Sequence, residues 1–276
     1  MNAATFDTRL LDTRIDAIAQ MRQRTWRRRA AVYGLLGLAV LWSVYVIVVA
    51  DTDWSRLAAS SLGTTIGRFM EFDVKLLPDL VDPAIDTALM ATLASLLGLL
   101  LALPVAWLGA ANITPLGKTS YMIGRGLMTL SRSVHEIVWG LIFVSAVGLG
   151  ALAGVLAMAV RSVGFISKII AEAIEDVQPG PIEAIRAVGG NKLQVLLYGI
   201  LPQVVPVVLG TVIFEWDINI RRSTIMGLVG AGGLGLVLFR QMAMSNYGGI
   251  MTVIFAVLLL IILGEVVSYY ARKAVL

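Results

Sequence analysis

A polar stretch between two long apolar segments decides the fold: EAIEDVQPGPIEAIRAVGGNKLQVLLYGILPQ, residues 172–203. Pro179-Gly180-Pro181 cannot lie inside a helix, so this triplet separates two helical pieces. Residues 182–188 then carry isoleucine or valine at every third position, which predicts a short helix with one apolar face. Gly189-Gly190 ends that helix, and residues 191–194, Asn-Lys-Leu-Gln, resemble a capping box that opens the next one. A short helix held between two breaks can dock on a soluble partner and pass rigid-body motion into the apolar segments.

The composition around this stretch is that of a membrane protein. The chain has 276 residues, of which 58% are hydrophobic and 14% are charged. Soluble domains carry about 25% charged residues, so a soluble globular protein is nearly excluded. Disorder is excluded as well, because so much apolar side chain cannot stay solvated. A helix needs about 20 apolar residues to cross a bilayer, and the chain has room for five or six such helices in one polytopic domain.

Six apolar segments predict an all-α membrane protein with six transmembrane helices. The segments cover about residues 30–50, 87–111, 121–148, 152–171, 196–216 and 249–270. Seven arginines precede the first segment, and Arg272-Lys273 follow the last one. The positive-inside rule therefore places both termini in the cytoplasm.

The predicted organisation has four parts. Residues 1–29 form a cytoplasmic basic amphipathic segment, and residues 30–50 form the first transmembrane helix. Residues 51–83 are mixed and polar, with more acidic than basic side chains, which suits a periplasmic segment. Residues 84–276 form the membrane core, with residues 172–195 as its cytoplasmic loop.

Two segments leave an alternative open. The N-terminus could be a signal peptide cleaved after Val48-Val49-Ala50, although its basic and apolar regions are both longer than usual. Residues 217–246 are rich in glycine and lie either outside the membrane or in a re-entrant segment.

The central stretch resembles the "EAA…G…LP" loop of the permease subunits of binding-protein-dependent ABC importers. Glu183-Ala184, Gly189 and Leu201-Pro202 carry the resemblance. Two positions depart from it: Ile185 stands for the second alanine, and Gly199 stands where isoleucine is common.

The flanking residues narrow the resemblance to the phosphonate/phosphite branch of these permeases. The segments that look alike are 132–136, 176–180, 217–221 and 229–233. The match covers roughly Asp82 to the C-terminus.

The resemblance implies a type I (MetI-like) ABC importer permease architecture, with residues 84–276 as the permease core. It implies that two permease subunits, here a homodimer, form the pathway and that two cytoplasmic ATPases hydrolyse ATP. A periplasmic or lipid-anchored binding protein would deliver a small phosphorus oxyanion, such as phosphonate, phosphite or hypophosphite, at the inner (plasma) membrane of a bacterium. The chain would then be no enzyme, have no catalytic residues and bind no cofactor or nucleic acid. ATP and Mg²⁺ would bind the partner, since this chain has no G-x-x-x-x-G-K-[ST] motif.

The same resemblance implies which residues meet the ATPase. Glu183 would enter a groove of the ATPase, where the apolar face of the short helix packs. Ala184, Ile185, Gly189 and Pro202 complete the predicted coupling set.

Arg132 and Glu136 lie inside the third predicted span, where ionisable side chains usually face a cavity or a partner. Arg132 and Glu136 are four residues apart and so share one helix face. Either they pair and fix helix packing, or Arg132 lines the pathway and offers the anion a bidentate donor. His135 replaces a proline that is common in the resembled branch, which puts the helix kink expected there in doubt.

A second charged cluster follows the fifth span and contains Glu215, Asp217, Arg221 and Arg222. Asp217 and Arg221 are again four residues apart. The cluster either contacts the oxyanion or the binding protein, or forms a solvated mouth with local ion pairs. Acidic side chains beside the arginines would weaken the positive electrostatic potential, so that an anion is released quickly.

Residues 227–235, GLVGAGGLG, contain a formal G-x-G-x-x-G pattern. A dinucleotide site is rejected, because no strand precedes the pattern and no βαβ unit surrounds it. Irregular backbone at this depth is tolerated beside a cavity. We therefore predict a gate loop with Gly230, Gly232, Gly233 and Gly235 as its flexible positions.

Three other functions compete with this interpretation. The same family could import another small solute, such as an amino acid, a metal ion or an osmolyte. A membrane-embedded enzyme lacks a catalytic set, because the chain has one histidine, no cysteine and no H-E-x-x-H motif; a metal site is excluded for the same reason. An ion channel should show a filter-like repeat or a charged ring, and neither is present.

Overall fold

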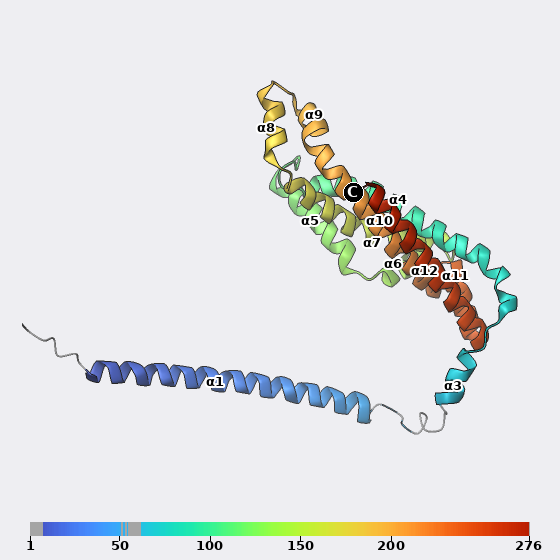
Figure 1. Cartoon of the computed structure of the whole chain (residues 1–276), viewed down its shortest axis with the longest axis horizontal. Helices are drawn as coiled ribbons and strands as arrows, with labels where there is room; N and C mark the ends of the chain where they lie inside the picture. Colours follow the sequence, from blue (N-terminus) through green and yellow to red (C-terminus); the bar gives the residue numbers. More distant parts are fainter. Residues whose placement is uncertain (1–7, 51, 53, 55–61, 276) are drawn as a thin grey trace, which may run out of the picture. The chain divides into compact units, whose positions relative to one another are not determined.

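The computed structural model describes residues 8–50, 52, 54 and 62–275, and side chains are described from residue 22 onward except at positions 62, 64 and 65 (Figure 1). These residues are almost entirely helical, and no strand occurs among them. The chain divides into two compact units, one that ends at Thr65 and one that covers Ile66–Leu276. The second unit begins earlier than the predicted core, because residues that precede the second span also pack on it. The backbone N–H of Asp73, for example, donates to Thr252 Oγ1 at 2.9 Å.

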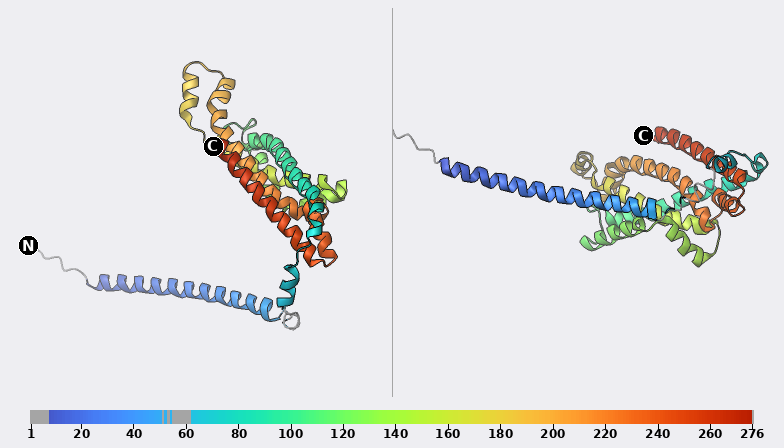
Figure 2. Two further views of the ribbon diagram at one scale, coloured as in Figure 1. Left: turned by 45° about the vertical axis from the view of Figure 1, so that its right-hand side comes forward. Right: turned by 90° about the horizontal axis from the view of Figure 1, so that it is seen from below.

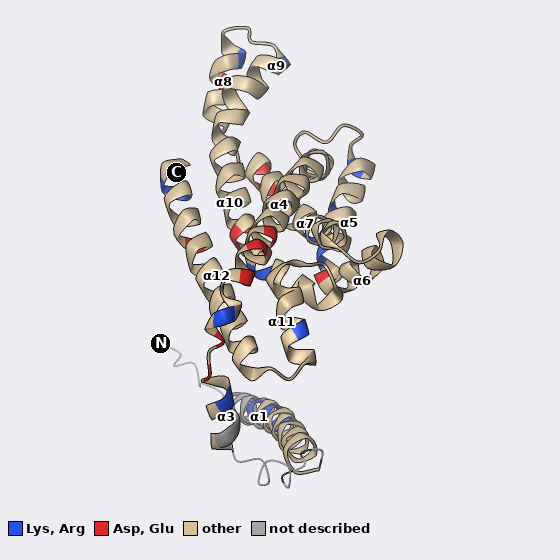
Figure 3. Cartoon of the chain, turned by 90° about the vertical axis from the view of Figure 1, so that its right-hand side faces the viewer, with Lys and Arg blue, Asp and Glu red and all other residues tan. Residues whose placement is uncertain are grey.

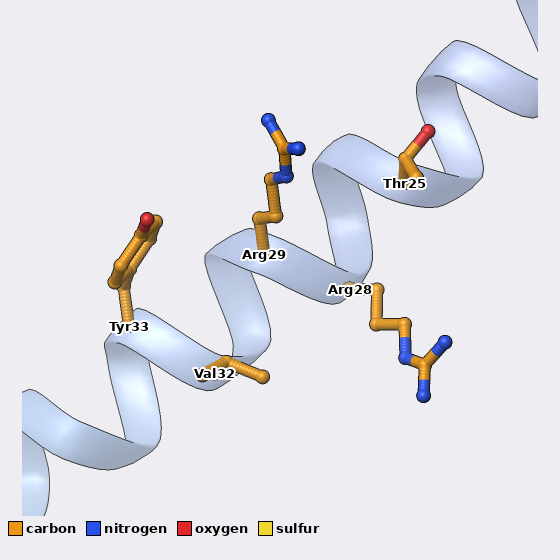
Figure 4. A pocket seen from close by; sticks show the side chains of 5 residues that line it. All are labelled: Thr25, Arg28, Arg29, Val32 and Tyr33. Carbon is orange, nitrogen blue, oxygen red and sulfur yellow. The ribbon is translucent and has the colours of Figure 1, made fainter. Parts of the chain in front are cut away.

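The first unit is dominated by one helix. Helix α1 (Thr8–Val44) continues without interruption into the π-helix η1 (Tyr45–Ala50). Its segment Arg22–Ala50 is long and apolar enough to cross a membrane, in agreement with the first predicted span. A shallow groove marks the place where arginines give way to apolar side chains (Figure 4); it is lined by Thr25, Arg28, Arg29, Val32 and Tyr33. The amphipathic pattern predicted before residue 22 lies outside the described side chains.

The second unit holds the remaining helices. They are α3 (Leu62–Phe69, which begins in the first unit), η2 (Val74–Leu76), η3 (Pro78–Leu80), α4 (Val81–Gly109), α5 (Lys118–Ser133), α6 (Glu136–Val147), α7 (Ala151–Glu175), α8 (Pro179–Ala187), α9 (Lys192–Gln194), η4 (Val195–Ile200), α10 (Leu201–Met226), η5 (Gly227–Val229), α11 (Gly233–Ala243) and α12 (Tyr247–Val275). Among the described residues, five helices or runs of helices are long and apolar enough to span a membrane, and the bent pair α5 and α6 makes a sixth. The predicted number of six spans agrees with the structure when this bent pair is counted as one span.

The third span is predicted as one helix over residues 121–148, but in the structure it consists of two helices. Helices α5 and α6 meet at an angle of 92°. Val134 is extended between them, and His135 begins α6 as its N-cap, where its Nδ1 accepts a hydrogen bond from the Ile137 N–H at 3.3 Å. The break therefore forms without proline. The first N–H groups of α6 have no acceptor within the helix, and the His135 side chain supplies one for the Ile137 N–H.

The fifth span is longer than predicted. Helix α10 continues to Met226, ten residues beyond the expected end at Trp216. Residues 217–226 therefore continue the helix of the fifth span. The prediction had grouped them with the glycine-rich stretch 217–246, outside the membrane or in a re-entrant segment. The helix continues because the polar side chains that suggested solvent have partners inside the protein.

The core is built on α4 and α7, which run side by side along the bundle (Figure 2). Small residues form their contact: a Cβ on Gly98 would lie 2.8 Å from Ser162 Cβ. Buried alanines continue this contact on both helices and are fully or almost fully covered: Ala91, Ala94, Ala102 and Ala106 on α4, and Ala153, Ala157 and Ala159 on α7. In a membrane, small residues let helix backbones approach closely, and this packing replaces the hydrophobic driving force. Helices α10, α6 and α5 pack around this pair.

Candidate functional site

The predicted docking helix is α8, which projects with α9 from one end of the second unit (Figure 1). It begins at Pro179, so the Pro-Gly-Pro triplet forms its first turn and the break lies at residues 176–178. Proline is accepted there because the first N–H groups of a helix have no helical partner. Helices α8, α9 and η4 form a helical hairpin, and α8 is its first arm. Gly189, with a φ of 83°, follows the end of α8. The capping box is confirmed: Asn191 accepts from the Gln194 N–H at 2.9 Å, and the Gln194 side chain accepts from the Asn191 N–H at 2.8 Å.

The hairpin divides the predicted apolar face of α8 in two. Ile182 and Ile185 pack against Gly199 on η4, where a Cβ would lie 3.3 Å from either side chain. Val188 on the same predicted face is 85% exposed, and Glu183 and Ala184 are exposed as well. Ile185 thus stabilises the hairpin from inside, and the surface free for a partner is the one around Glu183. Pro202 lies at the start of α10, beyond the hairpin.

A buried polar network joins α4, α7 and α10. Glu215 has no exposed surface, and its Oε1 accepts hydrogen bonds from Ser162 Oγ at 2.8 Å and from Arg222 Nη1 at 2.5 Å. Asn219 is equally buried; its Nδ2 donates to Ser95 Oγ at 2.9 Å, and its Oδ1 accepts from Arg222 at 3.1 Å. The network places a carboxylate and a guanidinium inside the bundle as a hydrogen-bonded pair, which is what burial of charge requires.

Glu136 extends this network to α6. Its carboxylate lies 3.9 Å from Arg222 and 3.7 Å from Arg161 on α7. Two carboxylates and two guanidinium groups therefore balance one another. Acidic and basic positions of the ribbon lie near one another in the middle of the bundle (Figure 3). The predicted alternative of a pair between Glu136 and Arg132 was wrong, because the helix breaks between the two residues and Glu136 turns to α7 and α10.

Arg132 stands apart from this balance. No hydrogen bond or ion pair is found for it among the described residues, and its Nε is buried without a partner. The side chain lies over α7, where a Cβ on Gly164 would be 2.7 Å from its Cγ. A guanidinium without a carboxylate partner among the described residues is available to an anion.

The predicted pair of Asp217 and Arg221 is confirmed at 2.8 Å on the other side of α10. Arg221 also lies 3.5 Å from Glu265 on α12, whose side chain is 64% exposed. Asp217 is buried. The interpretation of residues 215–222 as a solvated mouth was therefore wrong for their acidic members, which lie inside the bundle.

The glycine loop is packed rather than open. Gly230, Gly232 and Gly233 have φ values of 84°, 97° and 64°, which side chains rarely adopt. Gly235 lets α11 cross the end of α10, since a Cβ there would collide with the carbonyl oxygen of Thr224. The Leu234 N–H donates to Thr87 Oγ1 on α4 at 2.9 Å. Backbone conformation and close packing therefore explain why glycine occupies these positions. The role of the loop as a gate stays a prediction.

Sequence reasoning missed the neutral members of the network and one further ion pair. Ser95, Ser162 and Asn219 are small polar residues in apolar spans, and that alone could have indicated a polar contact. Arg125 and Glu175 form an ion pair at 2.8 Å between α5 and α7. No periodicity relates them, so no sequence pattern could have found the pair.

The chain matches known transport proteins. Residues 94–275 match the model of the family described as "Binding-protein-dependent transport system inner membrane component". The phosphite transport system permease protein PtxC of Stutzerimonas stutzeri is 36% identical over 248 residues, which is 90% of each chain. The phosphate-import permease protein PhnE of Mycolicibacterium smegmatis is 34% identical over 86% of this chain and 45% of its own length. The inward-facing MetNI methionine ABC transporter shares the fold, with a TM-score of 0.63 and 23% identity over 74% of this chain and all of the matched chain.

Proposed function

This chain belongs to the family of binding-protein-dependent transport system inner membrane components, and we propose that it forms half of the pathway by which a small phosphorus oxyanion enters a bacterial cell. The proposal rests on one observation above the others. A permease named for phosphite transport is 36% identical to this chain over 90% of both lengths, so the likeness includes the pathway and not only the coupling loop. The phosphate-import relative names the same chemical class of solute.

The proposed assembly contains two copies of this chain in the inner membrane, two cytoplasmic ATPases and a periplasmic or lipid-anchored binding protein. One copy supplies a single helical bundle, and a symmetric pair encloses a pathway between two bundles. The exposed surface of α8 around Glu183 and Ala184 supports docking on the ATPase. Gly189 and Ile185 hold the shape of the hairpin, and Pro202 starts the helix that carries motion into the bundle.

In this proposal Arg132 is the residue that contacts the anion in the pathway. Its guanidinium has no carboxylate partner within the described part of the chain, whereas Arg222 is neutralised by Glu215 and Glu136. Arg221 is likewise engaged, with Asp217. A single free arginine favours weak binding and quick release, which a transport pathway needs. The loop with Gly230, Gly232, Gly233 and Gly235 closes the pathway as its gate.

Import of another solute of this family, such as an amino acid or an osmolyte, is the second candidate. The methionine transporter supports it through shared fold alone, at 23% identity. The phosphite permease is similar over nearly the whole chain, so the oxyanion is the better supported solute.

The first test is growth and uptake with phosphite or a phosphonate as the only phosphorus source. A strain without this gene is complemented with the native gene, with Glu183→Arg or with Arg132→Gln. We expect no uptake with Glu183→Arg, because a reversed charge faces the ATPase. Arg132→Gln should reduce uptake roughly tenfold or more, since a hydrogen bond to a charged group contributes about 1.5–3 kcal/mol.

A matched control reverses a charge on the second arm of the same hairpin, Lys192→Glu, and should retain uptake. Normal uptake in the strain without the gene, in the absence of a redundant system, would remove the oxyanion as substrate. Normal uptake with Glu183→Arg would instead contradict the docking surface while leaving the substrate in place.

A further inference from the structure

The inner ends of three helices meet immediately before the coupling hairpin, the segment α8–η4. Arg125 on α5 points across this junction, where its Nη2 donates to both carboxylate oxygens of Glu175 at 2.8 Å. Its Nε donates to the carbonyl oxygen of Gly109, the last residue of α4, at 3.0 Å. One guanidinium therefore ties the ends of α4 and α7 to α5.

The same carboxylate also holds the chain that leaves α4. Glu175 Oε1 accepts a hydrogen bond from the Ala111 N–H at 2.7 Å, and next to it Asn112 Nδ2 donates to the Ile174 carbonyl at 2.6 Å. The backbones of α4 and α5 touch nearby, since a Cβ on Gly124 would lie 2.5 Å from the Gly109 nitrogen. The three helix ends therefore form a closely packed, hydrogen-bonded junction, and the ion pair of Arg125 and Glu175 is one part of it.

The coupling hairpin starts within one helical turn of this junction. Glu175 is the last residue of α7, and Gln178 is the N-cap of α8. The Gln178 N–H donates to Gln203 Oε1 on α10 at 2.9 Å. The hairpin base is therefore tied to α10 through Gln203 and to α4 and α5 through Glu175.

We propose that Arg125 and Glu175 are positioning residues that make the coupling hairpin and the inner ends of α4 and α5 move as one unit. Motion that the ATPase imposes on α8 then reaches the helices that line the pathway on both sides. The pair suits this task because a forked guanidinium fixes direction as well as distance. Both side chains are about three-quarters buried, 26% and 25% exposed, so water and salt screen the pair less than a surface pair. The inference rests on the proposed function, since it presupposes a partner that moves α8.

The native chain has no cysteine, so a distance between two chosen positions can be measured directly. Spin labels are placed at Leu116→Cys, in the turn between α4 and α5, and at Leu193→Cys in α9; both native side chains are well exposed. The distance is compared in the complete importer without nucleotide and with ATP trapped. We expect one unchanged distance when Glu175 is native. In Glu175→Gln we expect ATP to shift the distance by more than the width of the native distribution.

Glu175→Gln retains an oxygen that can accept from the Ala111 N–H, so it removes the ion pair and spares the fold. We expect it to lower the number of solute molecules imported per ATP hydrolysed at least severalfold, with ATP hydrolysis continuing. Arg125→Lys keeps the charge without the fork and should fall between native and Glu175→Gln. Glu265→Gln is the matched control for Glu175→Gln, because Glu265 on α12 forms a more exposed pair with Arg221 at 3.5 Å, and it should change neither readout.

An unchanged distance in Glu175→Gln, or an unchanged transport-to-ATP ratio in both Glu175→Gln and Arg125→Lys, would overturn the proposal. A drop in thermal stability without a change in either readout would also overturn it, since the pair would then be structural only. The distance does not depend on which solute is carried. A native complex that hydrolyses ATP but imports no phosphorus oxyanion would therefore refute the proposed function and still test this pair.

Discussion

Glu215 is completely buried in the bundle, with Arg222 as its charged partner at 2.5 Å. Breaking a buried pair by removing one charge leaves the other uncompensated, at a cost of about 3–5 kcal/mol. We expect Glu215→Gln to lower the stability of the purified protein by about that amount. The measurement is the midpoint of unfolding in detergent.

Glu265 supplies the comparison within the same molecule. It lies 3.5 Å from Arg221 but is 64% exposed, and exposed pairs contribute about 0–1 kcal/mol. Glu265→Gln should therefore shift the midpoint little. Equal shifts for the two variants would mean that Glu136 alone neutralises the charge of Arg222. The charge of Glu215 would then not be needed to balance the network.

Residues whose partners are close in sequence were predictable, and residues whose partners are distant were not. Spacing alone identified the pair of Asp217 and Arg221, because four residues make one helical turn. The same rule misled for Glu136, because the helix breaks just before it and its partners are on α7 and α10. Spacing rules assume a continuous helix, and the kink implied by the resemblance was in doubt because His135 stands in place of the proline.

At the scale of elements, the crossing of α10 and α11 depends on one position without a side chain. A Cβ on Gly235 would collide with the backbone carbonyl of Thr224, and backbone cannot rotate aside as a side chain can. We expect Gly235→Ala to destabilise the protein by about 1–3 kcal/mol through overpacking. The unfolding midpoint in detergent measures this as well.

Gly126 on α5 is the matched glycine, since nothing lies within 4 Å of the Cβ that alanine would add. Gly126→Ala should be neutral or stabilise the helix by roughly 0.5–1 kcal/mol. If Gly235→Ala behaved like Gly126→Ala, α11 would be free to move away from α10. That result would favour a mobile loop, as the predicted gate requires.

The elements of the hairpin were largely predictable because each boundary has a local chemical cause. The Asn191 cap and the positive φ of Gly189 depend on residues within one turn. The break before His135 has neither proline nor glycine, and the extension of α10 to Met226 depends on burial of Glu215 and Asn219 by other helices. Partners on distant helices leave no pattern in a single sequence, and histidine is not among the usual N-cap residues.

At the scale of the whole molecule, charge at one end of the bundle argues for its orientation. Arg186 and Lys192 lie on the hairpin, and α12 ends with Arg272 and Lys273 on the side where the hairpin projects (Figure 3). From the positive-inside rule we predict that this end faces the cytoplasm. Met244, between α11 and α12, then lies near the other face, because the 29 residues of α12 extend about 43 Å at 1.5 Å per residue.

The absence of native cysteine makes this orientation directly testable. We expect Met244→Cys to react with a membrane-impermeant maleimide in intact cells whose outer membrane has been opened. Leu116→Cys should react only in inverted vesicles, because Leu116 follows the end of α4 that meets the hairpin base. Both native side chains are more than 70% exposed, so an absence of labelling reflects the membrane barrier rather than burial within the chain. Labelling of both positions from the same side would show that residues 233–246 form a re-entrant segment or that α12 does not cross, and would remove the six-span topology.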